Sequence, residues 1–198
     1  MKTFISNGLL AIAILTQTPG SKAQTAQDAA DKVKALNLQV QRDLEERQPQ
    51  LAIPVLRQIV ALEPNDVDAR GNLGVLLYFQ GKYEEAIPQM RAAMQLQPDL
   101  WKIESLLGIA EKRTGDLNGA EDDLSKAFSK LDDTKIRIQT GLELLELLTP
   151  TGKLAQAAAV VEALENLEPQ NPQILLAAYE ISQQLLDQSL LSMTLAAP

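Results

Sequence analysis

A regular period of about 34 residues constrains the fold of this chain more than any other feature. Two amphipathic runs end in Leu-Glu-Pro at 62–64 and Leu-Gln-Pro at 96–98, one period apart. A later run ends in Leu-Glu-Pro at 167–169, two units plus three residues further on. Proline cannot continue a helix, so each tripeptide marks a helix end. A fixed period of this length is typical of solenoids, in which each unit stacks on its neighbours.

The second unit, residues 67–100, carries the clearest pattern. Its residues at helix crossings and turns are Leu73, Gly74, Gly81, Ala86, Ala93 and Pro98. Small residues let helices cross closely, and glycine at a helix end tolerates the left-handed conformation. These residues and their spacing resemble the tetratricopeptide repeat. The resemblance implies an all-α fold, a right-handed superhelical solenoid of antiparallel helix pairs with about four to five repeats.

The repeat register sets the expected boundaries. Repeats are expected at 33–66, 67–100, 101–134 and 135–171, followed by a partial capping repeat at 172–186 and a C-terminal tail at 187–198. The capping repeat must cover the last apolar face of the solenoid. Its expected inward stripe consists of Ile174, Leu175, Ala178, Ile181 and Leu185. Residues 24–32 form an N-terminal extension that either lengthens the first helix or frays.

Several units depart from the pattern. Val40 and Arg47 replace two glycines of the first unit, which predicts a looser hairpin. Asp132 replaces the closing proline of the third unit, so its second helix is expected to run on. The fourth unit needs three extra residues around 148–151, which predicts a longer first helix or a wider turn.

Two prolines recur in the second helices of the first two units. Pro54 and Pro88 occupy the same place in their units, one period apart. We expect both in the first helical turn, where a missing N–H costs nothing.

The N-terminal segment has the order of a secretory signal peptide. Lys2 precedes an apolar run at 9–15, and the small residues Ser21 and Ala23 favour cleavage after Ala23. The run is too short to span a bilayer core of about 30 Å. An uncleaved anchor and a buried first helix are the alternatives. We therefore expect residues 1–23 to be removed and the mature chain to be periplasmic or secreted.

The composition excludes several kinds of chemistry. The chain contains no Cys and no His, so thiol nucleophiles, Ser-His-Asp relays and Cys/His zinc sites are ruled out. Removing residues 1–23 leaves 16 basic and 26 acidic residues, a net charge of −10, which disfavours nucleic acid and anionic membrane surfaces. We expect no enzyme activity, no cofactor, and no catalytic or metal-binding residues.

Two acidic clusters have ordinary structural explanations. The segment 116–123 lacks the ligand spacing of a calcium loop, and Asp116 is placed to cap a helix. Glu143 and Glu146 share one helical face, and we expect them to be solvated rather than to form an acid–base pair.

The resemblance implies a concave groove, lined by first helices, that binds a peptide or a partner helix. The groove candidates are Asn72, Val75, Tyr78 and Phe79 of the second unit and Lys102, Ser105, Ile109, Lys112 and Arg113 of the third, beside Asp68 and Gly71. An aromatic floor beside three cations predicts a protein or peptide partner, with an acidic or C-terminal peptide as the sharper form of this hypothesis. Alternatively, the two aromatic residues only cover a neighbouring helix, and Lys112 and Arg113 only complement a helix dipole.

Two functions are compatible with this sequence. The first is a non-catalytic protein-interaction scaffold outside the cytoplasm. The second is a self-associating structural or assembly protein of the cell envelope, a homo-oligomer in which the apolar residues at 190–195 pack against a second copy.

Overall fold

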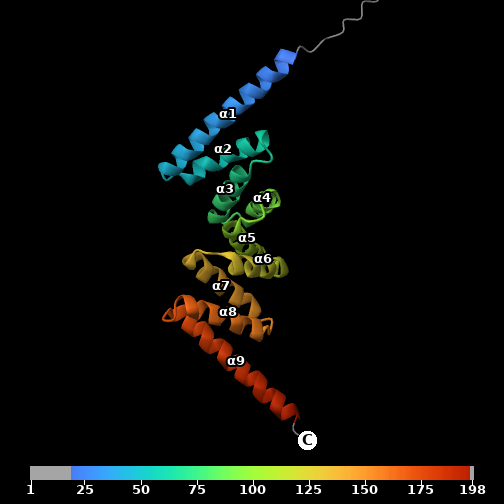
Figure 1. Ribbon diagram of the computed structural model, residues 1–198, viewed down its shortest axis with the longest axis vertical. Helices are drawn as coiled ribbons and strands as arrows, with labels where there is room; N and C mark the ends of the chain where they lie inside the picture. The colour runs from blue at the N-terminus through green and yellow to red at the C-terminus, as the bar shows by residue number, and fades with distance from the viewer. Residues whose placement is uncertain (1–18, 197–198) are drawn as a thin grey trace, which may run out of the picture.

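The computed structural model describes residues 19–196 of the chain, with side-chain surroundings for 24–195 (Figure 1). Within this range the protein consists of nine helices and no strand, which confirms the expected all-α fold. The helices are α1 (Pro19–Glu45), α2 (Pro49–Leu62), α3 (Val67–Phe79), α4 (Tyr83–Leu96), α5 (Trp101–Thr114), α6 (Leu117–Lys130), α7 (Thr134–Leu148), α8 (Leu154–Leu167) and α9 (Pro172–Ala196). None of the helices described combines the length and apolar character needed to span a bilayer.

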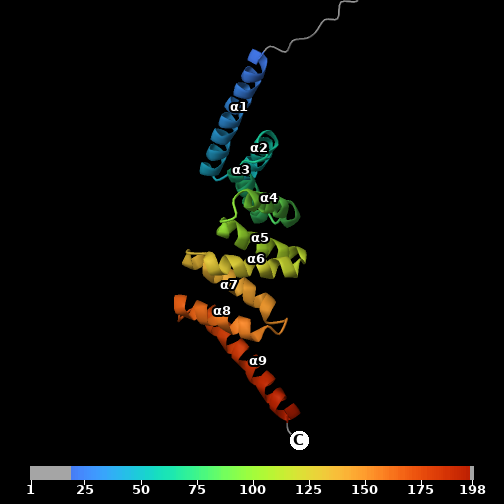
Figure 2. The same ribbon diagram turned by 45° about the vertical axis from the view of Figure 1, so that its right-hand side comes forward.

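The helices stack as successive hairpins along one axis (Figures 1 and 2). The first helices contact one another in sequence, α3 with α5, α5 with α7 and α7 with α9. The second helices α2, α4, α6 and α8 contact only the first helices beside them. A stack that is closer along one side must curve toward that side. The first helices from α3 to α9 therefore line the concave face, and the second helices form the convex face.

Glycine shapes the turns and crossings of the hairpins. Gly81 ends α3 with a φ of 72°, as predicted, and Gly115 and Gly152 adopt the same left-handed region in later units. A Cβ added to Gly74 would lie 2.7 Å from Cγ of Met90 on α4, so α3 and α4 cross too closely for a larger residue.

Arg47 takes the place of a turn glycine in the first unit. It keeps the left-handed conformation with a φ of 57°, and in the described range it is the one residue other than glycine to do so. The first hairpin thus has the same left-handed turn as the later units, and the backbone of Arg47 is strained by it. Val40, at the other substituted glycine position, is buried.

The expectation for the two recurrent prolines is wrong. Pro54 and Pro88 are each the sixth residue of their helices, α2 and α4, because these helices begin directly after the turn at Pro49 and Tyr83. Each proline leaves the carbonyl four residues earlier without its helical donor. Both positions are exposed, so water can satisfy that carbonyl.

The start of α6 was predicted correctly and its end was not. Asp116 caps the helix by accepting a hydrogen bond from the backbone N–H of Gly119 at 3.1 Å. The helix does not run on past Asp132 but ends at Lys130. Leu131 adopts an extended conformation and is buried. Asp133 caps α7 by accepting a hydrogen bond from the backbone N–H of Ile136 at 3.2 Å. The burial of Leu131 and the cap at Asp133 therefore end α6 and begin α7 where the other units have a proline.

The fourth unit uses both predicted adjustments. Its first helix, α7, has 15 residues, against 13 in α3 and 14 in α5, and its turn covers residues 149–153. Thr151 closes this turn by donating its hydroxyl to carbonyls at the end of α7, with a distance of 2.9 Å to Leu147 O.

The first and last helices of the described range, α1 and α9, are its longest, and at the N-terminal end this agrees with the predicted lengthening of the first helix. Residues 24–32 belong to α1, and the predicted cleavage position after Ala23 lies in the same helix, while residues 1–18 of the predicted signal peptide lie outside the described residues. The expected tail is not separate, since α9 continues past Leu186 to Ala196. Ile174 and Ile181 are buried as expected, whereas Leu175 is 48% exposed, because within the described residues α9 packs only on α7 and α8.

Candidate functional site

Three aromatic residues meet where α3 turns into α4, and we call Tyr78, Phe79 and Tyr83 the aromatic patch. The Tyr78 ring lies edge-on to Phe79 and to Tyr83, with centroids 5.3 and 5.5 Å apart. Tyr78 is half-buried and touches the apolar cores of both halves of the stack. Phe79 is 73% exposed, so it does not merely cover a neighbouring helix.

The electrostatic setting keeps the Tyr78 phenol neutral. Burial raises the pKa of Tyr78, and the neighbouring Tyr83 and Glu143 raise it further against the opposing effect of Arg113. A neutral phenol can both donate and accept a hydrogen bond. The aromatic patch therefore offers ring surface, a hydroxyl and a nearby guanidinium group.

Two of the predicted groove residues are not available to a ligand. Ser105 is buried, and its hydroxyl lies 2.6 Å from the hydroxyl of Thr140 on α7. Ile109 is 5% exposed and belongs to the core around α6 and α7. Both predictions fail for the same reason: α5 is packed between α3 and α7, so only part of its concave side reaches solvent.

The expected trio of cations is largely neutralised. Lys102 lies 3.4 Å from the carboxylate of Asp133. Lys112 bonds to Glu143 and lies 2.7 Å from Glu146, and its side chain is 11% exposed. Arg113 is exposed and forms no ion pair within the described part of the chain. The basic groove is therefore reduced to a single available cation.

The same contacts correct the expectation for Glu143, and they show that Lys112 does more than complement a helix dipole. Glu143 is not solvated, because its side chain is 11% exposed and accepts hydrogen bonds from Lys112 and, at 3.0 Å, from Gln139. Lys112 and Arg113 lie in the last turn of α5, where cations complement the helix dipole.

The remaining candidates lie on α3. Asn72 and Asp68 are exposed, and Val75 is half-buried. Gly71 is buried, and a Cβ added there would lie 2.9 Å from Cδ1 of Ile103, so this position serves the contact between α3 and α5.

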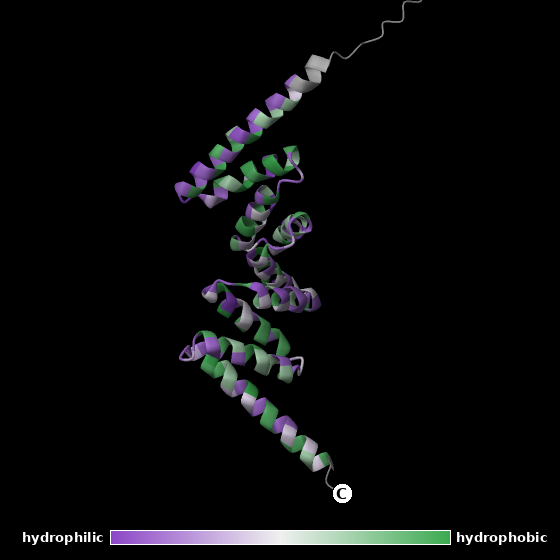
Figure 3. Cartoon of the chain, in the orientation of Figure 1, coloured by the Kyte–Doolittle hydropathy of each residue, from purple (hydrophilic) through white to green (hydrophobic). Residues whose placement is uncertain are grey.

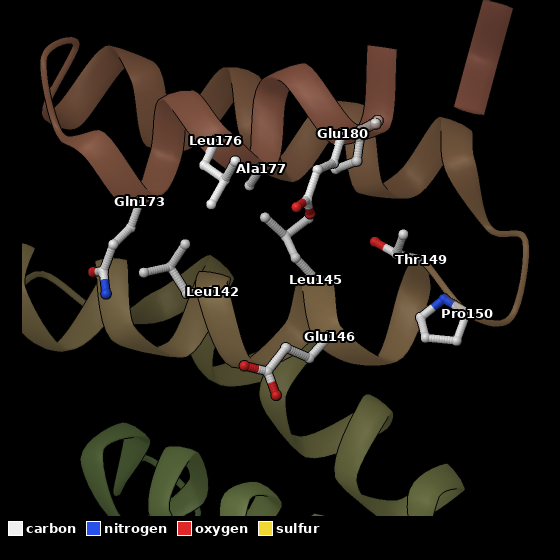
Figure 4. Close-up of a pocket in the computed structure, with 10 residues that line it drawn as sticks. Leu142, Leu145, Glu146, Thr149, Pro150, Gln173, Leu176, Ala177 and Glu180 are labelled. Atoms are coloured by element: carbon white, nitrogen blue, oxygen red, sulfur yellow. The ribbon is translucent and has the colours of Figure 1, made fainter. Parts of the chain in front are cut away.

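A pocket that the sequence analysis missed lies between α7 and α9 (Figure 4). Its volume is about 500 Å³. Its walls are mainly apolar, with carboxylates at the edge, and they include Leu142, Leu145, Glu146, Leu176, Ala177 and Glu180. Figure 4 shows Leu142 and Leu145 on α7 facing Leu176 and Ala177 on α9. Leu176, Glu180 and Glu146 stand at groove positions of the fourth and fifth units, so extending the repeat register beyond the third unit would have found them.

The family model of the tetratricopeptide repeat matches residues 43–107. Solved structures similar to this one include MamA from Desulfovibrio magneticus RS-1, with 15% identity, a TM-score of 0.62, and coverage of 84% of this chain and 98% of that one. Residues 43–107 therefore match the tetratricopeptide repeat, and the stack as a whole has the fold of a solved structure that covers 84% of this chain.

Two further solved structures have the same fold. YrrB, described as a tetratricopeptide repeat protein with an unusual peptide-binding site, is 18% identical with a TM-score of 0.64, over 83% of this chain and 82% of its own. PilF of Pseudomonas aeruginosa is 17% identical with a TM-score of 0.60, over 81% of this chain and 72% of its own. No curated protein matches the sequence significantly.

Two buried acids that the sequence analysis overlooked stand at positions of the repeat that are apolar in the next unit. Glu104 and Glu111 are 4% and 1% exposed, and the same places of the next repeat hold the buried Ile138 and Leu145. Arg91 of α4 donates a hydrogen bond to Glu111 at 2.6 Å. Two acids at core positions of one unit could have been recognised in the sequence, and they indicate that α5 packs on its neighbours through buried polar groups.

Burial controls the protonation of this acidic interface. It raises the pKa of Glu111 to about 7, and it raises the pKa values of Glu104 and Asp123. Buried acids of this kind are candidates for acid–base chemistry. Within the described residues, however, no group of His, Cys, Asp or Glu is arranged to hold a metal ion.

Proposed function

We propose that this tetratricopeptide repeat protein is a non-catalytic interaction module that binds an extended segment of a partner protein along its concave face. The supporting observation is that first helices at both ends of this face present apolar side chains to solvent. Phe79 is 73% exposed at one end and Leu176 is 56% exposed at the other. Exposed apolar groups beside a pocket are a common feature of interaction sites.

The two ends of the face offer different chemistry. At the aromatic patch, Phe79 provides ring surface, while the neutral Tyr78 and the unpaired Arg113 provide hydrogen-bond donors for a carboxylate. An acidic side chain or a terminal carboxylate of the partner fits this end. At the other end, the α7–α9 pocket provides an apolar cavity.

The absence of catalysis is part of the proposal. The chain has no Cys or His to act as a nucleophile or as a base near neutral pH. Glu111 already bonds to Arg91, and its position between α4, α5 and α6 makes it part of helix packing rather than of the concave face.

Site-directed photocrosslinking tests the binding face. A benzoylphenylalanine residue is placed at position 79 or 176 on the concave face, or at the exposed positions of Ser125 on α6 and Glu162 on α8 as controls. Irradiation of the native extract should give discrete protein adducts from the two concave positions and none from the two controls. Equal adducts from all four positions, or none at all, would contradict a concave binding face.

We also propose that the mature protein acts outside the cytoplasm. The support is the charged start, apolar run and small residues of positions 1–23. Fusion of residues 1–30 to a phosphatase that is active only after export should give activity, and a fusion carrying Ile12→Glu should not. N-terminal sequencing should then begin at Gln24, and a mature chain that retains Met1 would contradict cleavage.

Self-association through α9 is the second candidate function. The exposed apolar residues of its outer half are Leu186, Leu190, Leu191, Met193 and Leu195. Figure 3 shows hydrophobic residues continuing along the part of α9 that projects away from α8. Sedimentation at rising protein concentration should show a mass increase that Leu186→Glu abolishes. A constant monomer mass would leave only the interaction module.

A further inference from the structure

The α9 wall of the α7–α9 pocket belongs to a part of the chain that has no positive charge of its own. Lys153 is the last basic residue, and residues 154–198 contain five acidic residues, no Lys and no Arg. Of these acids, Glu180 lines the pocket and is exposed. It forms no ion pair within the described residues. Figure 4 shows its carboxylate directed into the space between α9 and α7.

The opposite wall adds to the negative charge. Glu146 lines the pocket from α7, and its side chain is 70% exposed although it lies 2.7 Å from Lys112. Lys112 also bonds to Glu143, so one ammonium group is shared between two carboxylates. Glu146 and Glu180 are the charged residues among those that line the pocket; Glu146 shares its cation with Glu143, and Glu180 has none within the described residues.

The floor of the pocket is apolar, and its side chains range from the exposed Leu176 to the buried Leu145. Leu142 and Leu145 come from α7, and Leu176 and Ala177 come from α9. The volume of about 500 Å³ is within the range of roughly 300–1,000 Å³ that is typical of ligand pockets. A purely charged ligand would leave this floor hydrated, and a purely apolar one would leave the carboxylates without a partner.

We propose that the α7–α9 pocket binds a basic–apolar segment of the partner, with a large apolar side chain in the cavity and a neighbouring Lys or Arg paired with Glu180. This inference rests on the proposed function and specifies the chemistry of the segment at one end of the concave face. Apolar burial supplies most of the attraction, and the charge pair sets which residues may stand beside the apolar anchor.

Peptide selection tests this chemistry directly. A library of random twelve-residue peptides is selected against the full chain, immobilised through an N-terminal tag. Enriched peptides should carry Lys or Arg within two residues of Leu, Ile, Met or Phe. The affinity of one enriched peptide is then measured by fluorescence anisotropy with the wild type, Glu180→Lys and Leu176→Glu, and with Glu162→Lys, an exposed acid of α8 outside the pocket, as the matched control.

We expect at least tenfold weaker binding for each pocket variant and unchanged binding for the control. Leu176 and Glu180 are exposed, so neither substitution disturbs the core. A peptide with its Lys or Arg changed to Glu should recover affinity for Glu180→Lys, which a merely structural effect would not produce.

The outcomes separate the inference from the proposed function. Enriched peptides that lose binding with Phe79→Ala but not with either pocket variant would overturn the inference and leave the concave face as the binding site. Failure of the charge-swapped peptide to recover affinity would overturn the pairing with Glu180. A selection that enriches no peptide at all would overturn both.

Discussion

The buried carboxyl of Glu111 predicts a specific dependence of stability on pH. Its side chain is 1% exposed, and Oε1 accepts hydrogen bonds from Arg91 at 2.6 and 3.2 Å. Its other oxygen, Oε2, is buried without a hydrogen-bond partner. Loss of hydration is the main reason why the pKa of Glu111 rises to about 7, and Arg91 only partly offsets it.

The sign and size of this pH dependence follow from the difference between the pKa of Glu111 in the folded protein and its pKa in the unfolded chain. The ordinary pKa of 4.5 applies to the unfolded chain, so the folded protein binds more protons between pH 4.5 and about 7. The contribution of Glu111 to the free energy of unfolding is therefore fully present below pH 4.5 and is lost as the pH rises through 7. At about 1.4 kcal/mol for each pKa unit, the loss approaches ~3 kcal/mol.

Glu111→Gln isolates this contribution, because glutamine resembles the protonated acid and can still accept a hydrogen bond from Arg91. Urea denaturation of the wild type and the variant should be compared at pH 4.5 and pH 8. The stability of the variant relative to the wild type should increase by about 3 kcal/mol between these two pH values. Glu162→Gln, on an exposed acid of α8, should show no such change. If the difference in stability between Glu111→Gln and the wild type also stays the same at both pH values, the reasoning is refuted.

Three further predictions concern turns, crossings and the concave face. Arg47→Gly should stabilise the protein by about 1 kcal/mol, because Arg47 holds a φ of 57°, and a lower melting temperature would contradict this. Gly74→Ala should destabilise it by about 1–3 kcal/mol in urea denaturation, because the new Cβ would lie 2.7 Å from a side-chain carbon of α4. Lys112→Met should cost about 3 kcal/mol by leaving buried Glu143 unpaired, whereas Lys102→Met, whose side chain is 64% exposed, should cost less than about 1 kcal/mol in the same assay.

Features that depend on a few neighbouring residues were predicted well. Gly81 adopts the left-handed conformation and Asp116 caps α6, since both roles depend on local backbone geometry. The small residue Gly74 was also placed correctly, because its position in the repeat implies a helix crossing. The ends of α6 and α9 were less predictable, since Leu131 and the residues beyond Leu186 carry no strong stop or breaking signal.

The concave site shows the limit of this kind of prediction. The repeat register identified Phe79 and Arg113 as solvent-facing, and both are exposed. It could not show that Ser105 and Ile109 are covered, because that depends on how closely α7 packs on α5. Periodicity gives the face of a helix but not the distance to the next helix.

The sequence by itself determined the solenoid, its period and its two faces, because a regular repeat of apolar, small and turn residues specifies each hairpin locally. Only the tertiary structure decided which charges remain available. Lys112 meets Glu143 and Glu146, which are 31 and 34 residues away, and Glu111 is buried against Arg91, 20 residues away. The α7–α9 pocket likewise forms between separate units. These contacts depend on the rotation and spacing of stacked hairpins, which no single repeat encodes.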